Sequence, residues 1–155
     1  MKYYLSLGGN LGDTRAIFQG ALARIGQTVG TVERVSSFYR TAPWGFEAPS
    51  DFLNAAVVVE SSLPPEEVLA ALWAIEKEFG RVRTGKGTGY ASRSLDLDIV
   101  FVEDRVIDTP DLTVPHPLAH RRRFVLEPLA EIAPQLRHPV LGKTVAELLA
   151  ECPDR

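Results

Sequence analysis

The stretch from Arg93 to Phe101 constrains the fold of this 155-residue chain most, because acidic and apolar residues alternate along it. Successive side chains of a β-strand point to opposite faces, so the alternation predicts a strand over residues 94–103. Asp96 and Asp98 then project from one face, with their Cα atoms about 6.5–7 Å apart. The opposite face is apolar and is formed by Leu95, Leu97, Ile99 and Phe101.

The two carboxylates border an apolar surface, since Val100 and Val102 continue their face of the strand. Burying two like charges so close together is costly unless a cation compensates them. Mg²⁺ is a natural candidate, because it binds through one or two carboxylates together with phosphates and waters. Two such ions can share a pair of acids in phosphoryl-transfer sites. Pairing with Arg93 or another arginine in a surface network is the alternative, and the spacing alone does not decide between them.

Segments with strand and helix patterns follow one another in the order strand, helix, strand, strand, helix, strand. Strands are predicted over residues 2–7, 29–40, 52–63 and 94–103. Helices are predicted after the N-cap Asp13, from Pro64 up to Gly80, and from Thr144 to Glu151 with Glu147 completing a capping box. This order predicts an α+β fold, a ferredoxin-like (split βαβ) sandwich with a mainly antiparallel sheet and extra C-terminal elements.

The composition indicates one globular domain over residues 1–155 and argues against several classes of protein. A net charge of −3 is unfavourable for a dedicated nucleic-acid binder. The single cysteine, Cys152, cannot form an internal disulfide. No apolar run approaches the roughly 20 residues of a membrane span. We therefore expect a cytoplasmic protein that binds neither nucleic acid nor a membrane. We also expect a monomer rather than an oligomer.

Basic residues gather in a few clusters, which are Arg81 with Arg83, Lys86 with Arg93, and the run 121–123. Arginines concentrated within an acidic chain suit a small polyanionic ligand. Beside two carboxylates, they would supply the positive clamp that a transferring phosphoryl group requires. A solvated basic hairpin is the alternative. The intervening residues 84–92 contain three glycines, and we expect them to form a mobile loop.

Four further residues each allow a functional and a purely structural interpretation. Asn54 lies in an apolar predicted strand, where its amide could read a heterocycle or merely satisfy a backbone edge. Phe52 and Phe124 could stack on a ring or simply belong to the core. His116 stands between two prolines, which suits a phosphate contact, although a lone histidine is often structural.

Several catalytic motifs are absent from the sequence. The stretch Gly85-Lys86-Gly87-Thr88 does not follow a strand as a phosphate-binding loop would, and no Gly-x-Gly-x-x-Gly follows the first predicted strand. There is no nucleophile elbow, so a covalent mechanism has no candidate nucleophile. A non-catalytic nucleotide sensor and an RNA-binding protein that uses residues 121–123 remain as rival interpretations.

Seven segments, taken in order, resemble the 6-hydroxymethyl-7,8-dihydropterin pyrophosphokinase family. The matching segments are Gly8–Gly12, Ser36–Thr41, Phe52–Ala56, Gly80–Arg83, Arg93–Ile99, Leu112–His116 and Arg122–Leu126 with its continuation through Pro134. The resemblance covers about residues 2 to 140, and its most specific parts are Leu-Asp-Leu-Asp-Ile and Val-Pro-His. It implies transfer of a pyrophosphoryl group from ATP to the hydroxymethyl group of the pterin, with release of AMP, in folate biosynthesis.

The resemblance also implies a role for each matching residue. Asp96 and Asp98 would be catalytic and would bind two Mg²⁺ ions, and Arg81 and Arg93 would clamp the triphosphate. The pterin would contact Thr41, Ala42, Trp44, Phe52, Asn54 and Phe124. ATP would contact Glu76, Arg83, Ile99, Thr113, His116 and Arg122.

This chain departs from the family pattern in the segment before the acidic strand. The family often has Arg-Trp-Gly-Pro-Arg there, whereas this chain has residues 86–93 without a tryptophan or proline. Phe52 replaces a frequent tyrosine, and Trp44 and Trp73 stand where some members have smaller or polar residues. We expect residues 84–92 to close over the site as a lid.

Overall fold

The computed structural model describes residues 1–10, 13–41, 52–80 and 94–153 of the chain. Its main sheet is antiparallel, with strand order β2-β4-β1-β5 and β3 paired to β4. The main-sheet strands are β1 (Lys2–Gly9), β2 (Thr31–Val35), β3 (Tyr39–Thr41), β4 (Phe52–Glu60) and β5 (Asp96–Val102). A small second sheet pairs β6 (Ile107–Asp108) with β7 (Thr113–Val114).

The helices are α1 (Thr14–Thr28), α2 (Pro65–Glu78), α3 (Arg123–Ile132) and α4 (Val145–Glu151), with a 3₁₀ turn at Ala119–Arg121. Local chemistry explains where they begin. The Asp13 carboxylate accepts a hydrogen bond from the Ala16 amide at 3.3 Å, and α2 begins at a proline followed by two glutamates. Thr144 and Glu147 form the predicted capping box of α4.

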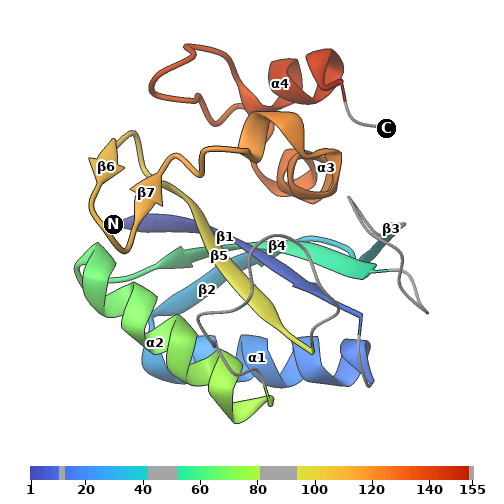
Figure 1. Cartoon of the computed structure of the whole chain (residues 1–155), viewed down its shortest axis with the longest axis vertical. Coiled ribbons are helices and arrows are strands. Elements are labelled where there is room, and N and C mark those ends of the chain that lie inside the picture. The colour runs from blue at the N-terminus through green and yellow to red at the C-terminus, as the bar shows by residue number, and fades with distance from the viewer. Residues whose placement is uncertain (11–12, 42–51, 81–93, 154–155) are drawn as a thin grey trace.

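The sheet separates two layers of helices. In Figure 1, α1 and α2 lie on one side of the sheet and α3 and α4 on the other. Every second residue of β1, of β4 and of β5 up to Ile99 enters the core beneath α1 and α2, as Leu5, Leu7, Ala55, Val57, Leu97 and Ile99 show. A register shift after Ile99 places Phe101 in the other cluster and Val102 in this core, the reverse of the faces predicted for them. The intervening residues of the same strands therefore face the layer formed by α3 and α4.

The helices α3 and α4 cover only part of that second face. Their apolar cluster includes Ala56, Val58 and Val100 from the sheet. Glu131 of α3 also accepts hydrogen bonds from the Ser37 amide and the Tyr39 hydroxyl, which ties the helix to the edge of the sheet. The polar residues of β4 and β5 lie further along the same face of the sheet.

The predicted strand 29–40 is interrupted in the structure. One extra residue enters it opposite β4 between Val32 and Arg34, and another between Val35 and Tyr39. Ser36 stands at the second interruption, where its amide donates to the Ala56 carbonyl at 2.9 Å and its hydroxyl accepts from the Ala56 amide at 2.8 Å. This side-chain bridge keeps the ladder satisfied across the irregularity.

Gly9, at the end of β1, gives a first prediction. A Cβ atom at this position would lie 2.4 Å from the carbonyl oxygen of Ser94, just before β5. Because backbone atoms cannot yield as a side chain can, we expect Gly9→Ala to destabilise the protein by about 1–3 kcal/mol in urea unfolding. Gly26→Ala is the matched control, since Gly26 is an exposed position of α1 where a Cβ would meet nothing nearer than 4.0 Å. It should stabilise by about 0.5–1 kcal/mol. An unchanged midpoint for Gly9→Ala would contradict this close approach.

Candidate active site

Two rows of facing residues cross the centre of the sheet. Asn54 of β4, Gly8 of β1 and Asp96 of β5 lie opposite one another in the first row. Ala56, Ser6 and Asp98 form the second row. Residues directly opposite in an antiparallel pair point to the same face, so the register places Asn54 and both aspartates on the face shared with α3. The shared face that alternation predicts for Asp96 and Asp98 is therefore present, with both residues half-buried.

Asn54 is held in one orientation at this face. It is 2% exposed, and its side-chain nitrogen donates to the Thr41 hydroxyl at 2.6 Å. A Cβ on neighbouring Gly8 would approach the Asn54 side-chain oxygen to 3.4 Å, so glycine keeps the approach to that oxygen open. Thr41 lies opposite Phe52 across β3 and β4, which puts an aromatic ring on the same face. The amide oxygen, the hydroxyl and the ring together suit a flat polar heterocycle.

A pocket of about 210 Å³ lies beside β5. It is lined by Leu97, Asp98 and Ile99 of β5, by Leu69 and Trp73 of α2, and by residues 111–113, His116 and Pro117 that follow β6. The structure thus brings Asp98, Ile99, Thr113 and His116 together, although they are separated by up to 18 positions in the chain. The aspartate connects this pocket with the polar face of the sheet.

The outer edge of β5 borders this pocket. The Leu97 amide donates to the Glu76 carboxylate at 2.7 Å, so Leu97 turns its backbone polar groups away from β1. Ile99 lies two residues after Leu97 and is paired with Leu5 of β1 in the same register as Leu97 with Leu7. Because backbone polar groups alternate in direction along a strand, the N–H and C=O of Ile99 also point away from β1. Beyond it, the Val100 carbonyl accepts from the His116 amide at 3.0 Å. The Ile99 backbone is therefore placed to present one donor and one acceptor at the edge.

His116 is positioned as a neutral hydrogen-bond donor. Its Nδ1 accepts from the Leu118 amide at 3.2 Å, which leaves the proton of the neutral ring on Nε2. Burial lowers the pKa of His116, while the negative charge of Asp96 acts in the opposite direction. The ring therefore stays uncharged at neutral pH and can donate one hydrogen bond from Nε2.

Arg122 and Phe124 stand at the start of α3. The Arg122 guanidinium carbon lies 5.7 Å from the centre of the Phe124 ring, within the range of a cation–π contact. Burial lowers the pKa of Arg122 to about 10, so the guanidinium is still charged at neutral pH. Phe124 also packs against the apolar cluster beneath α3. Phe124 thus lies on the side of the sheet that carries Asn54 and the aspartates, with Arg122 beside its ring.

Glu76 is buried, with 1% of its surface exposed, and it supports the sheet edge directly. Its observed contact is with the Leu97 amide, whereas the role toward ATP that the resemblance implies stays a prediction. Arg81, Arg83, Arg93, Ala42 and Trp44, together with the lid segment 84–92, lie outside the described residues. Nothing in the structure bears on them.

Several residues of the candidate site are not predicted by the sequence pattern. Ser6 and Gly8 enter through the register of β1, which single-strand patterns do not reveal. Leu69 and Trp73 are four residues apart on α2 and line the pocket together. Helical spacing is the signal that could have linked them.

The described residues contain no group of three or more histidine, cysteine, aspartate or glutamate side chains that could hold a metal ion by themselves. Two aspartates on one half-buried face still fit Mg²⁺, because this ion keeps several waters and takes its remaining oxygens from substrate phosphates. Within the same residues, no helix is long and apolar enough to cross a membrane.

Comparison with known proteins assigns the chain to a family. A family model described as 7,8-dihydro-6-hydroxymethylpterin-pyrophosphokinase (HPPK) matches residues 4–134. The chain belongs to this family. The resemblance stated from the sequence is thereby confirmed, and the chain is an ATP-dependent diphosphotransferase.

Two similar proteins carry the name 2-amino-4-hydroxy-6-hydroxymethyldihydropteridine pyrophosphokinase. The protein from Synechocystis sp. is 44% identical over 148 residues, which are 95% of this chain and 74% of that protein. The protein from Aquifex aeolicus is 36% identical over 148 residues, covering 96% of this chain and 90% of that protein.

Solved structures confirm the fold. The crystal structure of wild-type Plasmodium falciparum HPPK-DHPS matches with a TM-score of 0.77 and 17% identity. The match covers 97% of this chain and 44% of that chain, so the present chain spans less than half its length. An HPPK-DHPS structure in complex with substrates matches with a TM-score of 0.75 and 15% identity. The predicted ferredoxin-like α+β fold is therefore confirmed.

Glu76 gives a second prediction. Because Glu76→Ala leaves the Leu97 amide without its acceptor in a buried place, we expect a loss of about 1–3 kcal/mol in the free energy of unfolding. Glu76→Gln retains a side-chain oxygen and should lose less. Glu78→Ala is the control, since Glu78 is exposed and pairs with Arg24 at the surface, and its unfolding midpoint should barely move. Equal effects of Glu76→Ala and Glu78→Ala would argue against the buried contact.

His116 gives a third prediction, which ¹⁵N-edited NMR can check. At neutral pH we expect Nε2 to carry the proton, and the titration midpoint to lie below the unperturbed value of about 6.5. Because the pKa in the folded state is the lower one, this histidine favours folding above about pH 6.5 and loses that contribution as the pH falls through the folded pKa. His138→Gln would serve to assign the signals. Protonation of Nδ1 at neutral pH, or a midpoint above the unperturbed value, would contradict this arrangement.

Proposed function

We propose that this chain transfers the pyrophosphoryl group of ATP to the hydroxymethyl group of 6-hydroxymethyl-7,8-dihydropterin, giving the pterin diphosphate and AMP in folate biosynthesis. One observation carries the proposal. The register of β4, β1 and β5 places Asn54, Asp96 and Asp98 on one face, and Asp98 also lines the pocket of Ile99, Thr113 and His116. A heterocycle site and a nucleotide site would thus meet at the two carboxylates.

The pterin would lie on the polar face of the sheet. Asn54 would read its edge through the side-chain oxygen, and Thr41 would hold the amide in place. Phe52 and Phe124 would pack against the two faces of the ring, because offset aromatic contact provides a large area at little cost in entropy. Ala42 and Trp44 would complete this side of the site. The hydroxymethyl group would then point toward Asp96 and Asp98.

ATP would lie in the pocket beside β5. The outward N–H and C=O of Ile99 would pair with the edge of the base, with Thr113 beside it. His116 would donate from Nε2 to the phosphates without adding charge. Arg81, Arg83, Arg93 and Arg122 would supply the positive charge around the triphosphate, and Glu76 would line the nucleotide side. Residues 84–92 would close over both substrates and exclude water.

The transfer itself needs positioning and neutralisation of charge rather than a protein nucleophile. The hydroxymethyl oxygen would attack the β-phosphorus, and the bond from that phosphorus to the oxygen bridging the α-phosphorus would break. AMP leaves with that oxygen, and the hydroxyl proton is released to water.

Asp96 and Asp98 would hold two Mg²⁺ ions together with the phosphates. When bound, magnesium supplies neutralisation of the charge that develops on the transferring group. The protein's own part is to fix both carboxylates on one face, at positions opposite Gly8 and Ser6. Their half-burial limits competition from bulk water for the phosphate oxygens. We also propose that the chain acts in the cytoplasm as a single-domain monomer, without a nucleic-acid or membrane partner.

A fourth prediction tests this reaction. The wild-type protein with ATP, Mg²⁺ and the pterin should form AMP in step with the pterin diphosphate, as chromatography would show, and EDTA should stop it. Asp96→Asn and Asp98→Asn should each lower turnover by at least about 100-fold, while circular dichroism stays native.

Asp108→Asn is the matched control, because Asp108 is an exposed aspartate of β6 outside the pocket beside β5. Its turnover should equal that of the wild type. Formation of ADP would indicate single-phosphoryl transfer and refute the proposal. Binding of ATP without any nucleotide product would favour a nucleotide sensor, and full activity of Asp98→Asn would refute the metal-binding role.

A further inference from the structure

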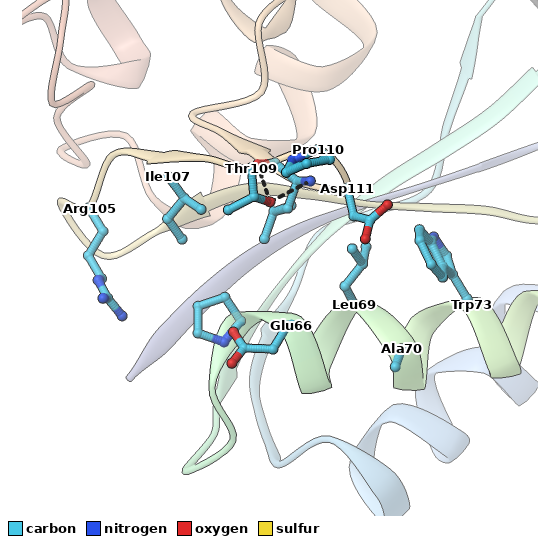
Figure 2. A pocket seen from close by; sticks show the side chains of 11 residues that line it. Glu66, Leu69, Ala70, Trp73, Arg105, Ile107, Thr109, Pro110 and Asp111 are labelled. Atoms are coloured by element: carbon cyan, nitrogen blue, oxygen red, sulfur yellow. Dashed lines mark hydrogen bonds between the residues drawn. The ribbon is translucent and has the colours of Figure 1, made fainter.

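A second, larger cavity of about 680 Å³ adjoins the pocket beside β5. Figure 2 shows it between the first turns of α2 and the hairpin of β6 and β7, with Glu66 and Arg105 toward one end. Both hollows share the lining residues Leu69, Trp73, Asp111 and Leu112. Trp73 therefore stands where the proposed nucleotide pocket opens into the larger cavity.

The position of Trp73 on α2 is fixed by its neighbours along the helix. Leu72, Ile75 and Glu76 are buried, and Glu76 is anchored to the amide of Leu97. Trp73 lies three residues before Glu76 and four after Leu69, so the three side chains form one stripe along the edge of β5. In Figure 2 the indole rises from α2 toward the hairpin, near Asp111.

The exposure of Trp73 distinguishes it from a core residue. The side chain is 38% exposed, whereas Val68, Leu72 and Ile75 of the same helix are at most 2% exposed. An exposed indole in the wall of a pocket offers a flat apolar surface that a ring ligand would bury. The other pocket wall presents backbone polar groups at Ile99, which an apolar ligand would leave unsatisfied.

We infer that Trp73 is the base-stacking residue of the nucleotide site. Its indole face would lie against the purine ring of ATP while the outward N–H and C=O of Ile99 bind the edge of the same ring. Stacking supplies affinity through ring area and hydrogen bonds supply orientation, and a purine satisfies both walls of the pocket. Trp73 thus contributes to preference for a purine nucleotide over a pyrimidine nucleotide. This inference rests on the proposed function, since it assigns a residue to its ATP site.

The test separates contact with the base from contact with the phosphates. Binding of Mg-ATP, Mg-CTP and magnesium tripolyphosphate is measured by calorimetry for wild type, Trp73→Phe and Trp73→Leu. We expect Trp73→Leu to bind ATP about 10-fold or more weakly, with a smaller loss for CTP and no change for tripolyphosphate. Trp73→Phe retains a ring and should recover much of the ATP affinity. Glu66→Gln is the control, because Glu66 is exposed and lines only the larger cavity.

Each outcome bears on a different conclusion. Unchanged ATP affinity in Trp73→Leu would overturn the stacking role, as would equal losses for ATP and tripolyphosphate, which would indicate a structural defect. If Glu66→Gln lowered the affinity for ATP as much as Trp73→Leu does, the base would lie in the larger cavity, and the contact with Ile99 would be wrong. If wild type forms AMP and the pterin diphosphate while Trp73→Leu binds ATP normally, only this inference fails. If wild type does not bind ATP, the proposed function fails first.

Discussion

The antiparallel register of β4, β1 and β5 is the constraint on which the rest of the site depends. It sets Asn54, Gly8 and Asp96 opposite one another and sets Asp98 opposite Ser6. A shift of one residue in either pairing would turn Asn54 or the aspartates into the core beneath α1 and α2. The register is secured because Leu5, Leu7, Val57, Leu97 and Ile99 fill that core on the other face. The same hydrophobic burial that stabilises the sheet therefore positions the polar groups.

Partial coverage of the second face by the described helices leaves room for the proposed substrates. The helices α3 and α4 pack on Ala56, Val58 and Val100, and Glu131 of α3 fixes the helix to Ser37 and Tyr39. The hydrogen bond from the Tyr39 hydroxyl lowers the pKa of Glu131, so this link is kept as a charged acceptor at neutral pH. The covering helix α3 begins at Arg123, and beside this end the Arg122 guanidinium lies over the Phe124 ring.

Local patterns were sufficient for most of the fold and for one central feature of the site. Alternation in residues 94–103 predicted the strand and the shared face of Asp96 and Asp98, and capping residues predicted the starts of α1 and α4. Helix α3 was not predicted, because Pro128 inside it removes a donor and breaks the helical pattern. The interruption at Ser36 and the hairpin of β6 and β7 were also missed, since both depend on pairing with distant segments. The pocket beside β5 required three separate parts of the chain, and no local pattern encodes their packing.

Among the described residues, β5 is an edge strand, and the proposed nucleotide site would use its exposed backbone groups. An unpaired edge exposes backbone donors and acceptors, and proteins usually cover such edges against association with other chains. Here the cover is discontinuous, with Glu76 bonded to Leu97 and His116 bonded to Val100. Ile99 lies between these two closures. If further hydrogen bonds covered the edge, they would satisfy the backbone of Ile99 and close the pocket. If the edge had no such hydrogen bonds, another strand could pair with it along its whole length. The hydrogen bonds at Leu97 and Val100 leave the backbone edge at Ile99 between them open to a flat ligand with one donor and one acceptor, which is a property of the edge of an adenine base.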